Sequence, residues 1–168
     1  RVFEDVWEVG EALANMADVQ GSKTPARTAL LFDWNNRWVL QDAQGPVKDK
    51  RHDEIVLEHY AALKRLGLDV DVIDSEQDFS PYSLIVSPML HMVKPGVAER
   101  LEAFVQGGGQ LAATYLSGQV DENDLCFLGG FPGPLRKLLG VWVEEVDALY
   151  PGQQNALSML GDAAFSGT

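Results

Sequence analysis

The feature that most constrains this chain is the regular alternation of short apolar runs with amphipathic stretches of helical period. The apolar runs cover residues 28–33, 69–73, 83–86, 110–115 and 141–146. Runs of this length predict strands that are buried on both faces. Because helical stretches separate them, the pattern predicts an α/β fold with a mainly parallel, flavodoxin-like sheet that helices cover on both sides.

Three of the stretches between the strands have clear helix signals. Residues 49–66 place apolar side chains on one helical face and end before Gly67, which is a typical C-cap. Pro95 opens a second helix, and Gly107 follows its last turn. Residues 135–139 predict a short third helix.

The first residues form a separate unit in this interpretation. Residues 1–19 predict an amphipathic helix with a wide apolar face, and residues 20–27 predict a linker. We therefore expect the first helix to belong to a preceding domain and the chain to be a fragment. Residues 28–168 then form one α/β domain, which we expect to be truncated at its C-terminal end.

Charge and cysteine content exclude several classes of protein. The 13 Lys and Arg residues against 25 Asp and Glu residues give a net charge of −12, which repels nucleic acid and anionic membranes. The single cysteine, Cys126, closes no intrachain disulfide and has no neighbours at zinc-site spacing. No apolar run approaches the roughly 18 to 20 residues that span a bilayer. These features predict a cytoplasmic protein without a bound metal.

The segment after the first predicted strand stands out by its length. We expect residues 34–48 to form a loop of about 15 residues, whereas such connections commonly have about 2 to 6. Its start contains Trp34, Asn35, Arg37 and Trp38. Tryptophan and arginine are enriched at interface hot spots, and tryptophan also stacks on sugars. The alternative is that both tryptophans only cover the edge of the sheet.

The sequence offers no convincing cofactor site. Gly107, Gly108 and Gly109 run from a helix into a strand, whereas phosphate loops run from a strand into a helix. The segment after the first strand also lacks the glycines and hydroxyls that hold a flavin or nucleotide. We therefore expect no cofactor.

The sequence also offers no convincing catalytic site. Ser117 follows the fourth strand, but the glycines of a nucleophile elbow are incomplete around it. His52 and His59 fall on a predicted helix and His91 on a loop, where histidines are more often solvated or satisfied than catalytic. An amidotransferase-like hydrolase would require a reactive Cys126 or Ser117. We assign no catalytic residue.

Acidic clusters have structural explanations. The loop with Asp121, Glu122 and Asp124 lacks the ligand spacing of a calcium loop, so we expect it to shape its own backbone through hydrogen bonds. A phosphoacceptor receiver domain would need paired acids after the first strand, where only Asp33 is present. It would also need an acid after the third strand, where the chain has Ser87 and Pro88 instead.

Four ordered segments resemble one known family. They are ALLFDWNNRW (29–38), LIVSPMLHMV (84–93), GGGQLAATYLSG (107–118) and VDENDLCFLGGFPGPLRKLL (120–139). Together they resemble the middle domain of glycoside hydrolase family 42 β-galactosidases over residues 27–147. Because four segments match in order, the resemblance is more specific than one short motif.

The resemblance implies a class I glutamine amidotransferase-like three-layer sandwich that mediates trimer formation. The two catalytic glutamates of the family lie on a TIM barrel, so no position here matches them. The helix over residues 1–19 then resembles the last helix of that barrel. The implied partners are two further copies of the chain and the barrel of the same or a neighbouring subunit, and a galactoside binds only in the full enzyme.

Two classes of function therefore remain open. The first is a non-catalytic assembly module, whose contacts also wall the sugar pocket of a neighbouring subunit. The second is a small-molecule domain that binds a sugar or nucleotide in the crevice at the strand ends. The candidate residues for a pocket rim or subunit interface are Trp34, Asn35, Arg37, Trp38, Ser117, Asp121, Glu122 and Asn123.

Overall fold

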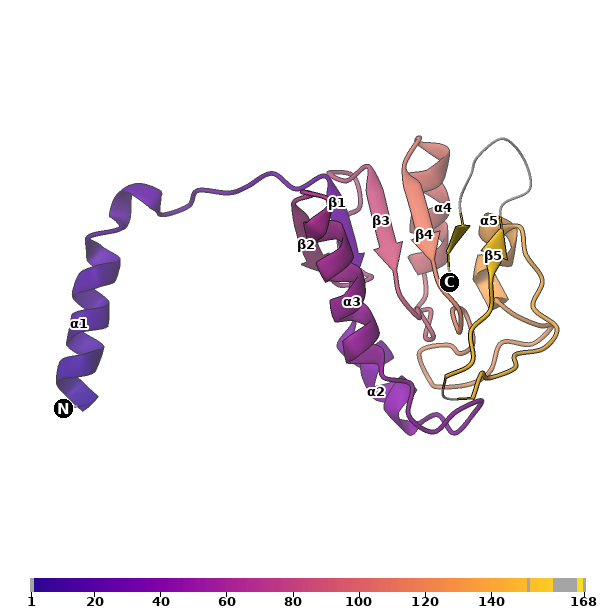
Figure 1. Cartoon of the computed structure of the whole chain (residues 1–168). Helices are drawn as coiled ribbons and strands as arrows, with labels where there is room; N and C mark the ends of the chain where they lie inside the picture. The colour runs from indigo at the N-terminus through magenta and orange to yellow at the C-terminus, as the bar shows by residue number, and fades with distance from the viewer. Residues whose placement is uncertain (1, 151, 159–165, 168) are drawn as a thin grey trace.

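The computed structural model describes residues 2–150, 152–158 and 166–167 of the chain. One four-stranded sheet forms its centre (Figure 1). Along the chain, the elements are α1 (Val2–Ala14), a 3-10 turn (Ala17–Val19), β1 (Thr28–Leu31), α2 (Trp34–Asp42), α3 (His52–Arg65), β2 (Val70–Ile73), β3 (Leu84–Ser87), α4 (Val97–Gln106), β4 (Gln110–Ala113), a second 3-10 turn (Gly133–Leu135), α5 (Arg136–Leu139), β5 (Leu157–Ser158) and β6 (Ser166–Gly167).

The sheet has the order β2-β1-β3-β4, and each neighbouring pair is parallel. Thr28 of β1 is in register with Val70 on one side and Leu84 on the other. Leu84 in turn pairs with Gln110 at the start of β4. This order confirms the predicted flavodoxin-like α/β architecture, and it makes β4 an outer strand of the sheet.

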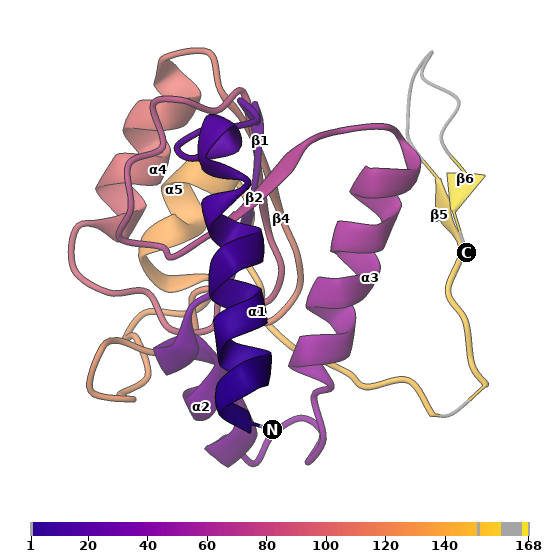
Figure 2. The same ribbon diagram turned by 90° about the vertical axis from the view of Figure 1, so that its left-hand side faces the viewer.

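Helices lie on both faces of the sheet, as the views in Figures 1 and 2 show together. Alternate residues of β1 point to opposite faces, because strands have a period of two residues. Ala29 and Leu31 join the core on the α4 side, together with Leu101. Leu30 joins a second core with Val56 of α3. Burial on both faces explains why the two central strands, β1 and β3, are almost continuous apolar runs.

The N-terminal helix α1 stands apart from the sheet in Figure 1. It is joined to β1 by an extended segment, and none of its residues is buried. Its apolar side chains include Val6, Trp7 and Leu13, all of them exposed. An apolar stripe of this width normally packs against another element. Among the described helices, none is both long and apolar enough to cross a membrane.

The prediction of a long loop over residues 34–48 is wrong in its first half. Residues Trp34–Asp42 form the helix α2. Asp33 begins this helix as its N-cap, because its carboxylate accepts hydrogen bonds from the backbone N–H groups of Asn35 and Asn36. Asn36 and Leu40, four residues apart, bury one face. The polar residues Asn35, Asn36 and Arg37 interrupt the apolar pattern, so the sequence alone did not predict this helix.

The prediction of a fifth strand over residues 141–146 is also wrong. In this segment, the structure records a single antiparallel bridge, between Val143 and Phe131. Val141 and Trp142 remain exposed. The segment is extended, but it pairs with a loop rather than with β4, so its apolar residues do not join the sheet.

Candidate functional site

Most of the buried polar residues of the domain lie at or beyond the carboxyl ends of the parallel strands. Asp33, which follows β1, is buried and lies at the centre of this group. Its carboxylate accepts a hydrogen bond from the Ser75 hydroxyl at 2.8 Å and forms an ion pair with Lys94 at 2.8 Å. Lys94 also pairs with Glu76 at 2.9 Å. One carboxylate therefore connects the segments that follow β1, β2 and β3.

The charge of Asp33 is stabilised by these partners. Burial raises the pKa of Asp33, but the hydrogen bonds and positive charge of Lys94, the Ser75 hydroxyl and the backbone of Asn35 together lower it below the ordinary value. The same pairing raises the pKa of Lys94 against the opposing effect of its burial. The pair is therefore ionised at neutral pH.

Asn36 connects α2 to the segment after β3. Its side-chain amide donates to the Met89 carbonyl at 2.9 Å, and its carbonyl accepts from the Met92 backbone N–H at 2.9 Å. The amide nitrogen also lies 3.4 Å from Nε2 of His52. Burial lowers the pKa of His52, so its imidazole is neutral at neutral pH. The orientation of α2 is thus held by buried hydrogen bonds rather than by apolar packing alone.

Replacement of Asn36 tests this attachment. Asn36→Ala removes both hydrogen bonds and leaves the buried Met92 backbone N–H without its partner, whereas the Met89 carbonyl still accepts from the His91 N–H. We therefore expect the free energy of unfolding to fall by about 1 to 3 kcal/mol. Urea denaturation measures the change. Asn35→Ala is the control, because the Asn35 side chain is exposed, and it should cost less than about 0.5 kcal/mol. Equal effects would contradict the role of Asn36.

Helix α2 presents an exposed aromatic surface. Trp34 and Trp38 are each 57% exposed, and their ring centroids are 6.1 Å apart. Phe32 makes an edge contact with Trp34 at 5.3 Å. The Arg37 guanidinium lies 5.4 Å from the Trp34 ring centroid, within the range of a cation–π contact. We call these four residues the tryptophan surface.

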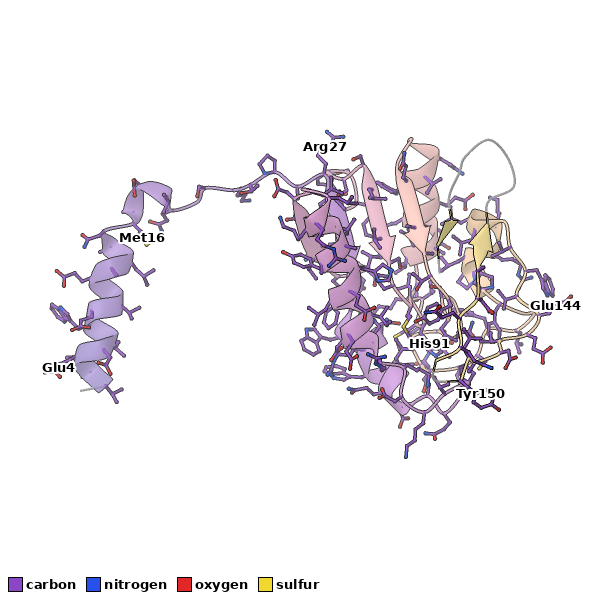
Figure 3. The ribbon with its side chains drawn as sticks, viewed as in Figure 1. Glu4, Met16, Arg27, His91, Glu144 and Tyr150 are labelled. Atoms are coloured by element: carbon purple, nitrogen blue, oxygen red, sulfur yellow. The ribbon has the colours of Figure 1, made fainter. Side chains whose placement is uncertain are left out.

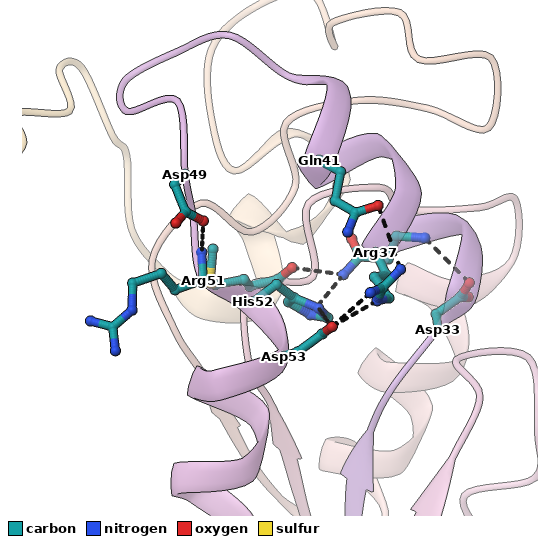
Figure 4. A network of polar contacts seen from close by, with 9 residues as sticks. Asp33, Arg37, Gln41, Asp49, Arg51, His52 and Asp53 are labelled. Carbon is teal, nitrogen blue, oxygen red and sulfur yellow. Dashed lines mark hydrogen bonds and ion pairs between the residues drawn. The ribbon is translucent and has the colours of Figure 1, made fainter.

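Arg37 is held in place by α3. Its Nε and Nη2 atoms donate to the two carboxylate oxygens of Asp53, each at 2.8 Å (Figure 4). The guanidinium lowers the pKa of Asp53 below its ordinary value. A bidentate pair of this kind fixes the plane of the guanidinium beside the Trp34 ring.

The tryptophan surface continues into an apolar groove on α3 and β2. The groove has a volume of about 380 Å³, and Leu57, Tyr60 and Val72 line it beside Phe32. Leu57 and Val72 are exposed. Contiguous exposed apolar patches of this kind mark interaction sites in soluble proteins.

The other candidate residues lie in the segment after β4 and have structural roles. Ser117 is buried, and its hydroxyl donates to the Thr114 carbonyl at 2.9 Å. One carboxylate oxygen of Asp121 accepts from the backbone N–H groups of Asn123 and Leu125 at 2.9 and 3.0 Å. These bonds confirm the predicted loop-shaping role of the acidic loop. Glu122 is exposed beside it.

A small cavity lies next to this loop. It has a volume of about 410 Å³ and is lined by His91, Cys126 and Phe131, among others. Nδ1 of His91 lies 3.3 Å from the Leu116 carbonyl, and burial lowers the pKa of its imidazole. Within the described residues, neither Cys126 nor Ser117 forms a hydrogen bond with a histidine, and the Ser117 hydroxyl is taken up by the Thr114 carbonyl. The described part of the chain therefore shows no activated nucleophile.

The structure therefore divides the predicted site residues into two groups. Trp34, Asn35, Arg37 and Trp38 share α2, whereas Ser117 and the acidic loop follow β4. Among the described residues, no recorded hydrogen bond or ion pair joins the groups directly. The segment over residues 89–93 lies between them, since it bonds to Asn36 on one side and to Val120 on the other.

Sequence reasoning missed the residues that organise this edge. Nothing near Asp53 or Lys94 in the sequence indicated their roles. Asp53 pairs with Arg37, 16 positions away, and Lys94 pairs with Asp33, 61 positions away. Asp33 did carry a signal, since an aspartate directly before a helical pattern is a common N-cap.

Comparison with known proteins identifies the fold and its context. A family model described as the β-galactosidase trimerisation domain matches residues 26–167. The chain belongs to the β-galactosidase trimerisation domain family. The β-galactosidase BglY of Alicyclobacillus acidocaldarius is 59% identical over 155 residues, which are 92% of this chain and 22% of that protein.

Solved structures agree with this assignment. The β-galactosidase of Rahnella sp. R3 superposes with a TM-score of 0.83 at 47% identity, over 96% of this chain and 24% of that chain. The β-galactosidase of Bacillus circulans sp. alkalophilus superposes with a TM-score of 0.82 at 42% identity, over 93% of this chain and 23% of that chain. The trimerisation domain thus spans about a quarter of the length of these relatives, and the resemblance to glycoside hydrolase family 42 is confirmed.

Proposed function

We propose that this chain is the non-catalytic assembly domain of a larger β-galactosidase and that it brings three subunits together. Membership of the trimerisation domain family over residues 26–167 carries this proposal. The tryptophan surface supports it, because rigid, exposed tryptophans with a fixed arginine have the composition of interface hot spots. Hydrolysis of terminal β-D-galactosides, by a retaining mechanism, then belongs to the rest of the enzyme, which we place in the cytoplasm.

The N-terminal helix has a place in this proposal. We assign residues 1–19 to the last helix of a preceding TIM barrel, residues 20–27 to a linker, and residues 28–168 to the assembly domain. The exposed apolar stripe of α1 supports the assignment, since a helix of this kind needs a partner. Val6 and Trp7 would face the barrel.

The acidic loop and the tryptophan surface would also form part of the wall of a neighbouring sugar pocket. Both are polar or aromatic and lie beyond the carboxyl ends of the strands, where α/β domains usually contact ligands. The two catalytic carboxylates of a retaining glycosidase would come from the barrel, about 5 to 5.5 Å apart.

Light scattering coupled to size exclusion tests the proposal. We expect the purified chain to form a species of three times its 18.4 kDa mass, in proportions that rise with concentration, and to lack β-galactosidase activity. A monomer at all accessible concentrations would contradict assembly by this domain. Turnover of a chromogenic galactoside would contradict its non-catalytic role.

A further inference from the structure

The side chain of His52 joins α3 to α2 through a contact that depends on its protonation state. His52 is the first residue of α3 and is only 6% exposed. Its Nε2 atom lies 3.4 Å from the side-chain nitrogen of Asn36 on α2. The Phe32 ring stacks on the imidazole with 5.8 Å between the centroids, and Phe32 also contacts Trp34. The imidazole therefore packs against one member of the tryptophan surface and faces the residue that anchors α2.

The orientation of the Asn36 amide is fixed by its two other contacts. Its oxygen accepts from the Met92 N–H, and its nitrogen donates to the Met89 carbonyl, each at 2.9 Å. A flipped amide would set a donor against the Met92 N–H and an acceptor against the Met89 carbonyl. The nitrogen thus turns its second hydrogen toward His52. Nε2 of His52 must then be an unprotonated acceptor, with the hydrogen of the neutral ring on Nδ1.

A proton on Nε2 turns this contact into a repulsion. The protonated imidazole is a donor at both nitrogens, so its Nε2–H opposes the N–H of Asn36. A flip of the Asn36 amide relieves this opposition but creates the two others, at Met89 and Met92. The buried cluster therefore satisfies all its hydrogen bonds only while His52 is neutral.

The charges around His52 do not compensate for its protonation. Asp53 Oδ1 lies 3.7 Å from Nδ1, and both oxygens of Asp53 already accept from Arg37 (Figure 4). A positive charge at the first residue of a helix is also unfavourable. Burial lowers the pKa of His52 and Arg37 adds to this effect, whereas Asp53 and the Pro88 carbonyl oppose it. The other charged residues that line the hollow beside His52 are Lys48, Asp49, Lys50, Arg51 and Glu54.

We propose that His52 makes the attachment of α2 sensitive to pH. At neutral pH, its Nε2 accepts from Asn36, and α2 stays against the domain. A proton from solvent that binds the Nε2 lone pair displaces the Asn36 side chain and releases α2 together with its two tryptophans. Helix α2 is suited to local release, because it has nine residues and buries two of them, Asn36 and Leu40. This device belongs to a single copy of the chain, so it is independent of trimer formation.

Hydrogen exchange of the full 168-residue chain at pH 7.5 and pH 5, corrected for intrinsic exchange rates, measures the release. Asp33 and Asp53 stay ionised in this window, because their pKa values are held below the ordinary value. Released His52 protonates near its ordinary pKa of about 6.5, which favours the released state by up to tenfold per pH unit above the folded-state pKa. We expect the protection of residues 38–43 to fall about 10-fold, while that of β1 is unchanged.

Three variants assign the response. His52→Gln stays neutral and offers Asn36 a carbonyl, so protection at pH 7.5 should persist and the pH response should disappear. Asn36→Asp gives protonated His52 an acceptor and opposes the Met89 carbonyl, so protection should rise as the pH falls. His91→Gln is the matched control, because burial also lowers the pKa of His91. His91 lies beyond the carboxyl ends of the strands (Figure 3), and its replacement should leave the response of α2 unchanged.

Nitrogen-15 spectra of the imidazoles provide a second measurement, with the His52 signal assigned by its loss in His52→Gln. We expect neutral His52 to carry its hydrogen on Nδ1. A neutral ring with its hydrogen on Nε2 would overturn the proposal, as would equal protection of α2 at both pH values. A response that survives in His52→Gln, or disappears in His91→Gln, would assign it to another group. If His52→Gln does not fold, the reversed response of Asn36→Asp and the tautomer decide the question.

Discussion

Asp33→Ala lowers the free energy of unfolding by about 3 to 4 kcal/mol, because it leaves the Lys94 ammonium largely buried without its main partner. The substitution also removes the N-cap of α2, which contributes about 1 kcal/mol. Urea or thermal denaturation measures the change. Asp78→Ala is the control, because Asp78 caps only an exposed turn, and it should cost less than about 1 kcal/mol.

A second variant separates the ion pair from the cap. Asp33→Ala/Lys94→Met removes both charges, so we expect it to regain about 1 to 2 kcal/mol relative to the single variant. No recovery would mean that the cap and the Ser75 hydrogen bond carry the whole effect. A single variant as stable as the wild type would contradict the central role of Asp33.

The same carboxylate makes stability depend on pH. Since the folded protein holds the pKa of Asp33 below its ordinary value, its contribution is complete above about pH 4 and is lost as the pH falls through the folded-state pKa. The wild type should therefore lose more stability than Asp33→Ala between about pH 5 and pH 2. Parallel pH profiles of the two proteins would contradict this assignment.

Gly118→Ala should be comparably destabilising, by about 3 to 5 kcal/mol. A Cβ atom at this position would lie 2.2 Å from the Pro132 carbonyl oxygen, and the backbone has a φ of +67°, which side chains rarely adopt. Both the strain and the overpacking contribute. Thermal denaturation measures the loss, and the segment over residues 117–134 should become sensitive to proteases.

Gly108→Ala separates these two causes. Gly108 also has a positive φ, of +95°, but no atom lies within 4 Å of the added Cβ. Gly108→Ala should therefore lower the free energy of unfolding by only about 1 to 2 kcal/mol, through backbone strain alone. Equal losses at both glycines would contradict the close approach of Pro132 to Gly118.

The fold follows from the sequence because its signals are local. Residues 28–33 and 83–86 are apolar runs that only a sheet covered on both faces can bury, and Gly67 terminates α3 as its position predicts. The positions of four strands and of the helices α3 and α4 thus follow from periodicity and capping. The resemblance of four ordered segments to glycoside hydrolase family 42 then identified the family as well as the fold.

The candidate site depends on contacts between residues that are distant in the chain. Asn36 meets Met89 and Met92 across 53 and 56 positions, and no pattern within α2 predicts these partners. The segment over residues 141–146 shows the opposite case: it has a strand-like pattern but forms only a single bridge, between Val143 and Phe131. Local propensity is a weak prior, and tertiary packing decides it.

The sequence alone determined the fold class, the order of the principal strands and the family, because apolar periodicity and ordered motifs are properties of short segments. The tertiary structure alone decided that Asp33 joins three strand ends, that Asp53 fixes Arg37, and that the tryptophans of α2 remain exposed. Hydrogen bonds and ion pairs act over about 3 Å in space, so only the folded chain brings such partners together.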